Sequence, residues 1–121
     1  SAPARHPSGM DYAARRCVPC EGGIPALGPR QVDEALGSLD GWDARENRTR
    51  IHKHFRFRDF AEAMRFVNAM AAVAEAEGHH PDFELHGWNH VDVTLWTHAV
   101  GGLSENDFIL ASKIDALPEA R

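Results

Sequence analysis

Two adjacent histidines beside carboxylates are the sequence feature best suited to chemistry. They stand in the segment Glu75-Ala76-Glu77-Gly78-His79-His80-Pro81-Asp82. An imidazole gains and loses a proton near neutral pH, so it can act as a general acid or a general base. Glu75 and His79 are four residues apart, and a helix continuing past Gly78 would bring the carboxylate onto that imidazole and fix its tautomer. The segment therefore predicts proton-transfer chemistry.

A third imidazole, His98, precedes Gly101 and Gly102, which permit a sharp bend and the close approach of a flat ligand. Pro81 favours an extended backbone at His80, so we expect the two adjacent rings to point in different directions. A structural role is the alternative for the pair, because histidines at a helix C-terminus gain from the helix dipole.

Four of the eight histidines suit simpler roles. His52 and His54 share the side of a predicted strand opposite Ile51, so we expect them to be solvated. We expect His86 and His90 to edge a loop.

The two cysteines, Cys17 and Cys20, raise the question of a metal. With two histidines they would make a four-ligand zinc set, but no second pair follows at the spacing of compact zinc modules. We therefore expect no metal. The cysteines are interpreted as an anchor for the N-terminal segment or as a redox-labile pair.

Length and charge narrow the class of protein. A chain of 121 residues is one domain's worth, and its 13 Lys and Arg against 18 Asp and Glu give a formal charge of −5 without a dense basic tract. We expect no nucleic-acid partner. No run approaches the roughly 18 apolar residues of a membrane span, and the start lacks the apolar region of a secretory signal. The expected location is the cytoplasm, without membrane contact.

The elements that must position the histidines follow from the apolar periodicity. Residues 1–22, rich in Pro, Gly and Arg, predict an N-terminal arm that is partly flexible, and residues 23–121 a single domain. The order of elements predicts an α+β fold, a four-stranded antiparallel sheet with three helices packed on one face. The expected helices are 31–39, a long one capped by Asp59 and closed by Gly78, and one beginning at Ser104; the expected strands are 42–47, 50–57, 83–85 and 90–98.

Two of these helices carry specific signals. The long helix has an apolar stripe at three- and four-residue steps. In the last helix Ser104 and Asp107 are spaced as a capping box, which by itself explains an acid at that position. The residues of the stripe are Phe60, Met64, Val67, Met70, Ala71 and Ala74.

These features together resemble the pterin-4a-carbinolamine dehydratases, also called 4a-hydroxytetrahydrobiopterin dehydratases, and in particular their bacterial branch. The resemblance runs over 17–117 and includes the words Leu95-Trp96-Thr97-His98 and Gly101-Gly102-Leu103-Ser104-Glu105-Asn106-Asp107-Phe108. The spaced pattern is carried by Glu75, His79, His80, Pro81, Trp88, His98 and Asp107.

The resemblance implies an enzyme that removes water from a 4a-hydroxytetrahydropterin to give the quinonoid dihydropterin, with no cofactor. It implies a homodimer or homotetramer. His80 and His98 would lie near the departing hydroxyl, and His79 with Glu75 would handle the ring proton. These four residues are the predicted catalytic set; the predicted substrate-binding residues are Pro81, Asp82, Phe83, Trp88, Thr97 and Asp107.

Three departures from the family pattern and a rival class accompany this hypothesis. Gly78 stands where an acid is common, Phe83 where tryptophan is common, and the stretch between His80 and His98 is one residue longer than in the animal enzymes. Dehydratase-like domains also serve as non-catalytic proteins, including Rubisco assembly factors of chloroplasts and carboxysome-bearing bacteria and a dimerisation partner of a transcription factor. Rubisco is therefore the alternative partner.

Overall fold

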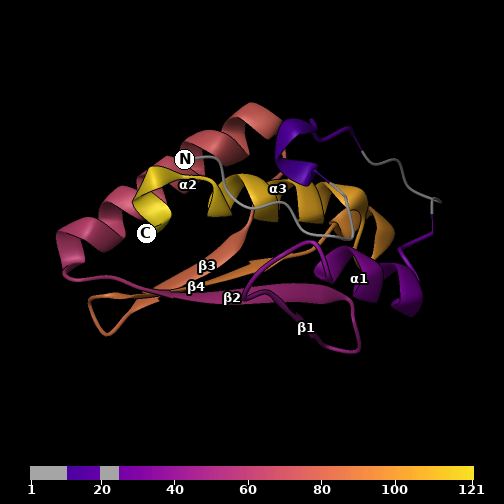
Figure 1. The fold of residues 1–121 in the computed structure, drawn as a ribbon, viewed down its shortest axis with the longest axis horizontal. Coiled ribbons are helices and arrows are strands. Elements are labelled where there is room, and N and C mark those ends of the chain that lie inside the picture. The colour runs from indigo at the N-terminus through magenta and orange to yellow at the C-terminus, as the bar shows by residue number, and fades with distance from the viewer. Residues whose placement is uncertain (1–10, 20–24) are drawn as a thin grey trace.

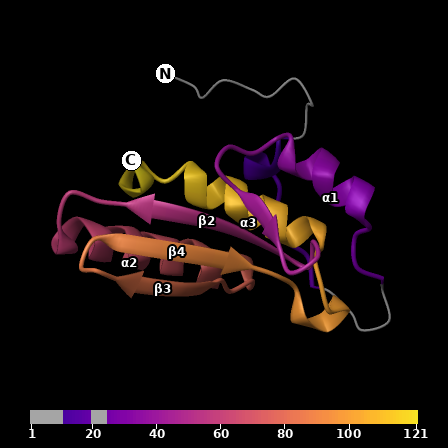
Figure 2. The same cartoon turned by 90° about the horizontal axis from the view of Figure 1, so that it is seen from below.

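A computed structural model describes residues 11–19 and 25–121 of the chain. Three α-helices lie on one side of a four-stranded antiparallel sheet, which confirms the predicted α+β architecture (Figure 1). Seen from below, the other side of the sheet is open (Figure 2). The elements are η1 Tyr12–Ala14, α1 Pro29–Leu36, β1 Asp43–Arg45, β2 Arg50–Arg56, α2 Phe60–Glu77, β3 Asp82–His86, β4 His90–Leu95, η2 His98–Val100, α3 Glu105–Asp115 and η3 Pro118–Ala120.

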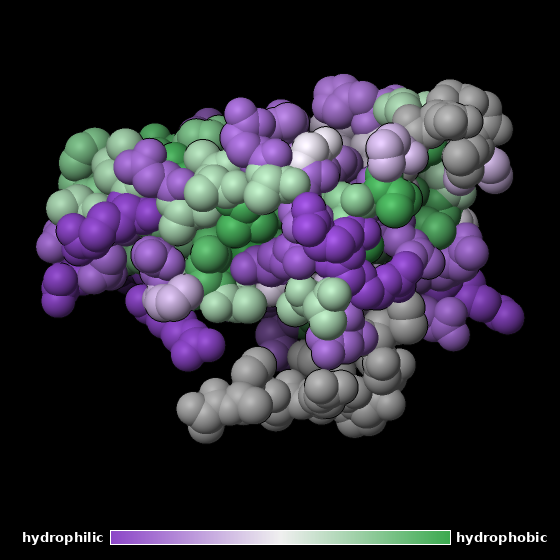
Figure 3. Space-filling model, turned by 90° about the horizontal axis from the view of Figure 1, so that it is seen from above, coloured by the Kyte–Doolittle hydropathy of each residue, from purple (hydrophilic) through white to green (hydrophobic). Residues whose placement is uncertain are grey.

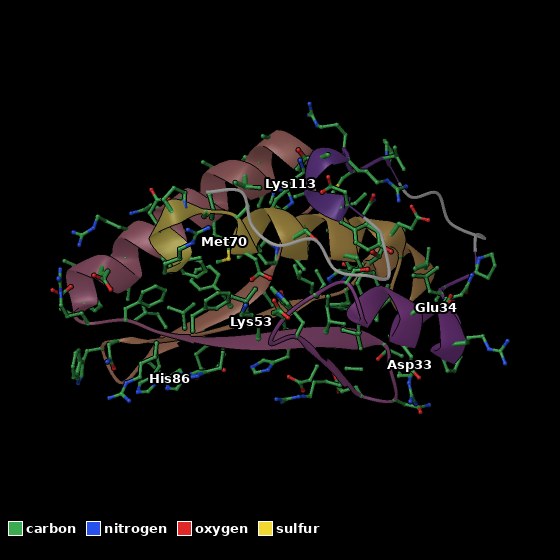
Figure 4. All side chains as sticks on the ribbon, viewed as in Figure 1. Asp33, Glu34, Lys53, Met70, His86 and Lys113 are labelled. Carbon is green, nitrogen blue, oxygen red and sulfur yellow. The ribbon has the colours of Figure 1, made fainter. Side chains whose placement is uncertain are left out.

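The sheet has the strand order β1-β2-β4-β3, with every neighbouring pair antiparallel. Because side chains alternate along a strand, Ile51 and Phe55 of β2 and Val91, Val93 and Leu95 of β4 all face the helices and are buried. Figure 4 shows the same alternation in polar residues, with Lys53 pointing toward the helices and His86 to the open side. The Nζ of Lys53 donates a hydrogen bond of 2.9 Å to Oδ1 of Asp115 in α3.

The long helix α2 is capped as expected but buries a different stripe. Asp59 accepts a hydrogen bond from the Glu62 amide, and Gly78 closes the helix in the left-handed conformation. The predicted stripe is partly wrong, since Phe60, Met64 and Ala71 are exposed. The buried face runs through Ala63, Phe66, Val67, Met70 and Ala74.

Phe66 explains this rotation of the helix. Its ring centroid lies 4.6 Å from that of Phe55 and 5.1 Å from that of Phe57, so it docks on β2 and turns Phe60 and Met64 outward. A three- and four-residue pattern allows either stripe, and the tertiary contact decides between them.

Several boundaries differ from the sequence-based expectation. The first helix begins at Pro29, where a missing amide costs nothing, and ends at Leu36 instead of residue 39. The first strand stops at Arg45 because residues 46–48 are left-handed. The last strand ends at Leu95, and His98 begins a short 3-10 turn. Residues 1–10 of the predicted arm lie outside the described residues, as does Cys20.

Two expectations about the remaining histidines are also settled. His54 is exposed, but the side chain of His52 is only 14% exposed and is bonded at 2.8 Å to Asp92, so the expectation of a solvated His52 is wrong. His86 is the last residue of β3 and His90 the first of β4, and the two residues pair across the turn. The expectation that they edge a loop is therefore confirmed.

Candidate active site

His79, His80 and His98 line one hollow of about 460 Å³, a size within the usual range of small-molecule sites. The first two follow the C-terminus of α2, and the third lies in η2 after β4. We call this the imidazole hollow. Its lining residues are Val18, Pro19, Glu77, Gly78, His79, His80, Pro81, Asp82, Trp96, Thr97, His98, Ala99 and Asn106.

His79 is paired with a fully buried carboxylate. Its Nε2 lies 2.6 Å from Oδ1 of Asp107, which is 0% exposed. The other oxygen, Oδ2, accepts hydrogen bonds from the Thr97 hydroxyl at 2.8 Å and from the Ser104 amide at 3.0 Å. An Nε2–H that donates to Asp107 leaves Nδ1 as the basic nitrogen of His79, so the carboxylate selects the tautomer.

His80 is paired with Glu75 in a much more open setting. Its Nε2 lies 2.6 Å from Oε2 of Glu75, and the two side chains are 63% and 77% exposed. An exposed pair of this kind contributes little to stability. It holds the imidazole at the mouth of the hollow, where water has access.

The expected contact between Glu75 and His79 is wrong, and Gly78 is the reason. Gly78 has a φ of 65°, which ends the helix before residue 79 and turns the chain away from the helical path. The carboxylate of Glu75 therefore meets the second imidazole, and the first is free to turn toward α3. The two rings point in different directions, as Pro81 led us to expect.

His98 is packed against an aromatic ring that the sequence analysis left without a role. The centroids of His98 and Trp96 are 3.6 Å apart. Trp96 is itself held by a hydrogen bond of 3.1 Å from its Nε1 to Asp82 and by the Arg50 guanidinium, 3.7 Å from its ring centroid. Among the described residues the His98 imidazole has no hydrogen-bond partner, so both of its nitrogens are available to a ligand.

The predicted substrate-binding residues fall into two groups. Pro81, Asp82 and Thr97 line the imidazole hollow, and Asp107 lies directly behind His79. Phe83 is 49% exposed on the edge strand β3. Its register partner is Val93, so its side chain lies on the helical side of the sheet, although the residue also borders a hollow formed by side chains of the open face.

Trp88 lies apart from both hollows. It is 60% exposed in the turn between β3 and β4, with a φ of 61°. A substrate contact by Phe83 or Trp88 stays a prediction.

The arm supplies two wall residues that the sequence analysis did not place at the site, Val18 and Pro19. The position of Trp96 at the site could have been predicted, because it lies two residues before His98 and therefore on the same face of the predicted strand. The signal for the arm was absent, because no periodicity links residues 17–19 to the ends of α2 and α3.

The metal alternative finds little support in the cysteine that the structure describes. Burial, together with the nearby Glu77 carboxylate, raises the pKa of the Cys17 thiol to about 12. Metals bind the thiolate, which this environment disfavours in the metal-free protein. Across 11–19 and 25–121 no group of three or more His, Cys, Asp or Glu side chains is arranged to hold a metal ion. Within the same ranges no helix is both long and apolar enough to cross a bilayer.

Comparisons with known proteins agree on one family. The family model described as pterin 4 alpha carbinolamine dehydratase matches residues 25–117. A relative from Azoarcus sp. (strain BH72), named after the same dehydratase, is 43% identical over 107 residues, which are 88% of this chain and 91% of the relative. The pterin-4-alpha-carbinolamine dehydratase 2, mitochondrial, of Arabidopsis thaliana is 44% identical over 88% of this chain and 59% of its own length.

Two solved structures share the fold. A transcriptional coactivator/pterin dehydratase from Brucella melitensis matches with a TM-score of 0.73 and 38% identity, over 79% of this chain and 99% of that chain. A pterin dehydratase-like protein identified as a RuBisCO assembly factor in the alpha-carboxysome matches with a TM-score of 0.54 and 27% identity, over 63% of this chain and 87% of that chain.

Proposed function

Because the chain belongs to the pterin 4 alpha carbinolamine dehydratase family, we propose that it dehydrates a 4a-hydroxytetrahydropterin to the quinonoid dihydropterin by general acid–base catalysis. The observation that carries this proposal is the convergence of His79, His80 and His98 on one hollow, two of them paired with carboxylates. The reaction needs one acid and one base on either side of a flat heterocycle, and imidazoles serve as both at neutral pH.

The reaction consists of one bond cleavage and one proton removal. The C4a–OH bond breaks, and the hydroxyl leaves as water with a proton from an acid. The N5–H bond gives its electron pair to a new C4a=N5 double bond, and its proton goes to a base. Acid and base then exchange protons with solvent, so no redox partner or metal is required.

His79 is the base in this proposal, and His80 with His98 supplies the acid. The buried Asp107 holds the His79 tautomer whose Nδ1 is basic, and it stabilises the imidazolium that forms. His80, at the open mouth, and His98, without a protein partner among the described residues, can reach a departing water. Glu75 positions His80, in place of the His79 contact expected from the sequence.

Stopped-flow turnover of synthetic 4a-hydroxytetrahydropterin tests the proposal. His79→Ala, His80→Ala and His98→Ala should each lower kcat by about 10²–10⁴-fold, the usual contribution of a general acid or base. The matched control is His54→Ala, an exposed histidine on the open face of the sheet, which should keep the wild-type rate. A wild-type protein that does not exceed the rate in buffer would exclude the activity.

The second candidate function is assembly of RuBisCO, favoured by the structural likeness to the alpha-carboxysome protein. We place it second because the identity is 27% against 38% for the Brucella pterin dehydratase, and the coverage is lower. Co-expression with RuBisCO subunits separates the two. Assembly predicts more soluble, assembled RuBisCO, and dehydration predicts no change.

A homodimer or homotetramer is part of the proposal. Phe60 and Met64 of α2 are 53% and 37% exposed, and hydrophobic residues gather on the helical side of the molecule (Figure 3). Exposed apolar side chains grouped on one face are typical of protein contacts. Sedimentation of the wild type and of Phe60→Asp measures the assembly state, and a wild-type monomer would contradict it.

A further inference from the structure

The backbone beside His98 is fixed by hydrogen bonds, whereas the His98 imidazole is oriented by a ring contact. The preceding residue, Thr97, donates its amide to the Gly102 carbonyl at 2.7 Å and its hydroxyl to the buried Asp107 at 2.8 Å. The imidazole is exposed, makes no hydrogen bond to any described residue, and packs against Trp96. An exposed side chain without hydrogen bonds exchanges readily between rotamers, so the orientation of this ring depends on the indole.

The indole of Trp96 is itself fixed from the strands on both sides of β4. Its Nε1 donates a hydrogen bond of 3.1 Å to Oδ2 of Asp82, the first residue of β3. On the other side of β4, Ile51 of β2 pairs with Leu95. The antiparallel register therefore places Arg50 opposite Trp96. The guanidinium carbon of Arg50 lies 3.7 Å from the centroid of the indole, which is a cation–π contact.

Arg50 is in turn held at the start of β2. Its guanidinium contacts the Glu46 carboxylate at 2.9 Å and donates a hydrogen bond of 2.9 Å to the Thr49 hydroxyl. The side chain of Arg50 is 23% exposed, so the cation is largely withdrawn from water, and a cation–π contact is stronger where water is excluded. The β1–β2 turn and the start of β3 thus both support the ring that orients His98.

We propose that Trp96 is a positioning residue for the dehydration, which keeps the His98 imidazole turned toward the imidazole hollow, and that Arg50 keeps Trp96 in place. This inference rests on the proposed function, in which His98 helps to protonate the departing hydroxyl. Trp96 acts through His98 and not on the reacting atoms. An aromatic pair favours its own arrangement by a factor of roughly two to ten, so loss of the indole should cost about that factor in kcat.

A double-mutant cycle measured by stopped flow tests this coupling. Trp96→Leu should lower kcat by about two- to tenfold and leave KM unchanged, because the indole orients an acid and does not bind the substrate. In a His98→Ala background the same change should have no further effect, since the group that the indole positions is gone. In a His79→Ala background it should cost the full factor. Single turnovers with the enzyme in excess keep the slow variants measurable.

Conservative variants and a matched control separate positioning from a general loss of structure. Trp96→Phe keeps an aromatic ring and should retain more of the kcat than Trp96→Leu. Arg50→Leu should lower kcat, and Arg50→Lys should restore part of it, because an ammonium group also makes a cation–π contact. The control is Arg56→Leu, the same change at an exposed arginine of β2 that does not line the imidazole hollow, and it should keep the wild-type kcat.

NMR of the His98 ring supplies a readout that does not depend on turnover. The ring current of an indole at this distance shifts the imidazole protons, which His98→Ala identifies by their disappearance. The shift should shrink in Trp96→Leu and Arg50→Leu and persist in Arg56→Leu.

Three outcomes would overturn the inference. The first is an unchanged His98 shift in Trp96→Leu, and the second is an equal loss of kcat from Trp96→Leu with and without His98. In both cases wild-type turnover would leave the proposed function standing. The third is a wild-type protein without turnover, which would overturn both.

Discussion

At the scale of single residues, the carboxylate of Asp107 makes two kinds of contact: it caps helix α3, and it pairs with His79. Its Oδ2 accepts from the Ser104 amide and closes the capping box of α3, and its Oδ1 contacts His79. Capping box and site contact had been competing interpretations of this residue. The structure shows that the carboxylate caps α3 and also contacts His79, because it has enough lone pairs for both contacts, while its role toward a substrate stays a proposal.

Replacing this carboxylate by an amide separates the two tasks. Asp107→Asn can still accept from the Ser104 amide, but it can present an NH₂ group to His79 and favour the wrong tautomer. We expect kcat to fall by about 10²–10⁴-fold and the free energy of unfolding to fall by about 1–3 kcal/mol, the cost of disturbing a buried hydrogen-bonded group. Stopped-flow turnover and urea unfolding measure the two effects.

Glu75→Gln is the control for this variant, since it makes the same chemical change at the other histidine pair. Because that pair is exposed, stability should change by less than about 1 kcal/mol. Its kcat should fall by much less than that of Asp107→Asn. If the two variants lost the same amount of kcat and of unfolding free energy, burial of the carboxylate would not explain the effect of Asp107→Asn.

Residue types and spacing sufficed to single out His79, His80 and His98, but not to assign their partners. The partner of His79 comes from a helix 28 positions along the chain. A local rule can propose only Glu75, because long-range contacts leave no periodic signal.

At the scale of elements, the end of α2 decides where the two adjacent imidazoles point. Gly78 has a φ of 65°, and a Cβ placed there would meet nothing within 4 Å. Gly78→Ala should therefore cost only backbone strain, about 1–2 kcal/mol. Gly78→Asn should cost less, because asparagine tolerates the left-handed conformation.

Urea unfolding measures these costs, and kcat shows whether the imidazoles stay in place. If the turn is kept, both variants retain most of the wild-type turnover. Equal stability of the alanine variant and the wild type would mean that the chain leaves the left-handed conformation at no cost. In that case kcat should reveal displaced histidines.

Helix caps and alternation made most elements predictable. Asp59, Gly78 and the Ser104 box mark helix ends by local hydrogen bonding, and β4 alternates strictly, while β2 alternates except at the half-buried Lys53. The exposed Phe60 and Met64 show the limit, since an apolar stripe does not reveal which of two overlapping faces a neighbouring strand will cover. The turn between the first two strands was predictable at 47–49, but the left-handed conformation of residues 46–48 was not, because none of them is a glycine.

At the scale of the whole molecule, the arm is attached by charge as well as by hydrogen bonds. Glu77 contacts Arg16 at 3.0 Å and Lys113 at 3.7 Å. Although burial opposes ionisation, the Cys17 amide and these two cations lower the pKa of Glu77 below its ordinary 4.5. The folded state thus favours the carboxylate form.

The lowered pKa of Glu77 determines how the stability of the protein changes with pH. A lowered pKa in the folded state gives stability that is present above pH 4.5 and is lost as the pH falls through the lower folded value. Glu77→Gln should cost about 1–3 kcal/mol at pH 7, and this difference from wild type should shrink below pH 4.5. Urea unfolding at a series of pH values measures it. The exposed Glu119→Gln should follow the wild-type curve, and a Glu77→Gln deficit that stays constant into acid would contradict the assignment.

The boundary between an arm and a domain stays a prediction, and the position of residues 17–19 could not be predicted from the sequence. Their attachment depends on Glu77 and Asn106, which read as ordinary polar residues of two helices and become anchors only when α2 and α3 meet. The hollow is accordingly built from three separate stretches besides the arm, and its outline exists only in the assembled molecule.

The contact between the rings of Trp96 and His98 gives the protein an optical probe of the hollow. The emission of an indole depends on the groups in contact with it, so the light from Trp96 reports on its contact with His98. Trp42 is buried and Trp88 lies in a distant turn, so replacing both by phenylalanine leaves a single emitter at the hollow. A ligand that enters the hollow and contacts either ring would then change the emission of this single tryptophan, so the binding of a substrate could be followed without a label.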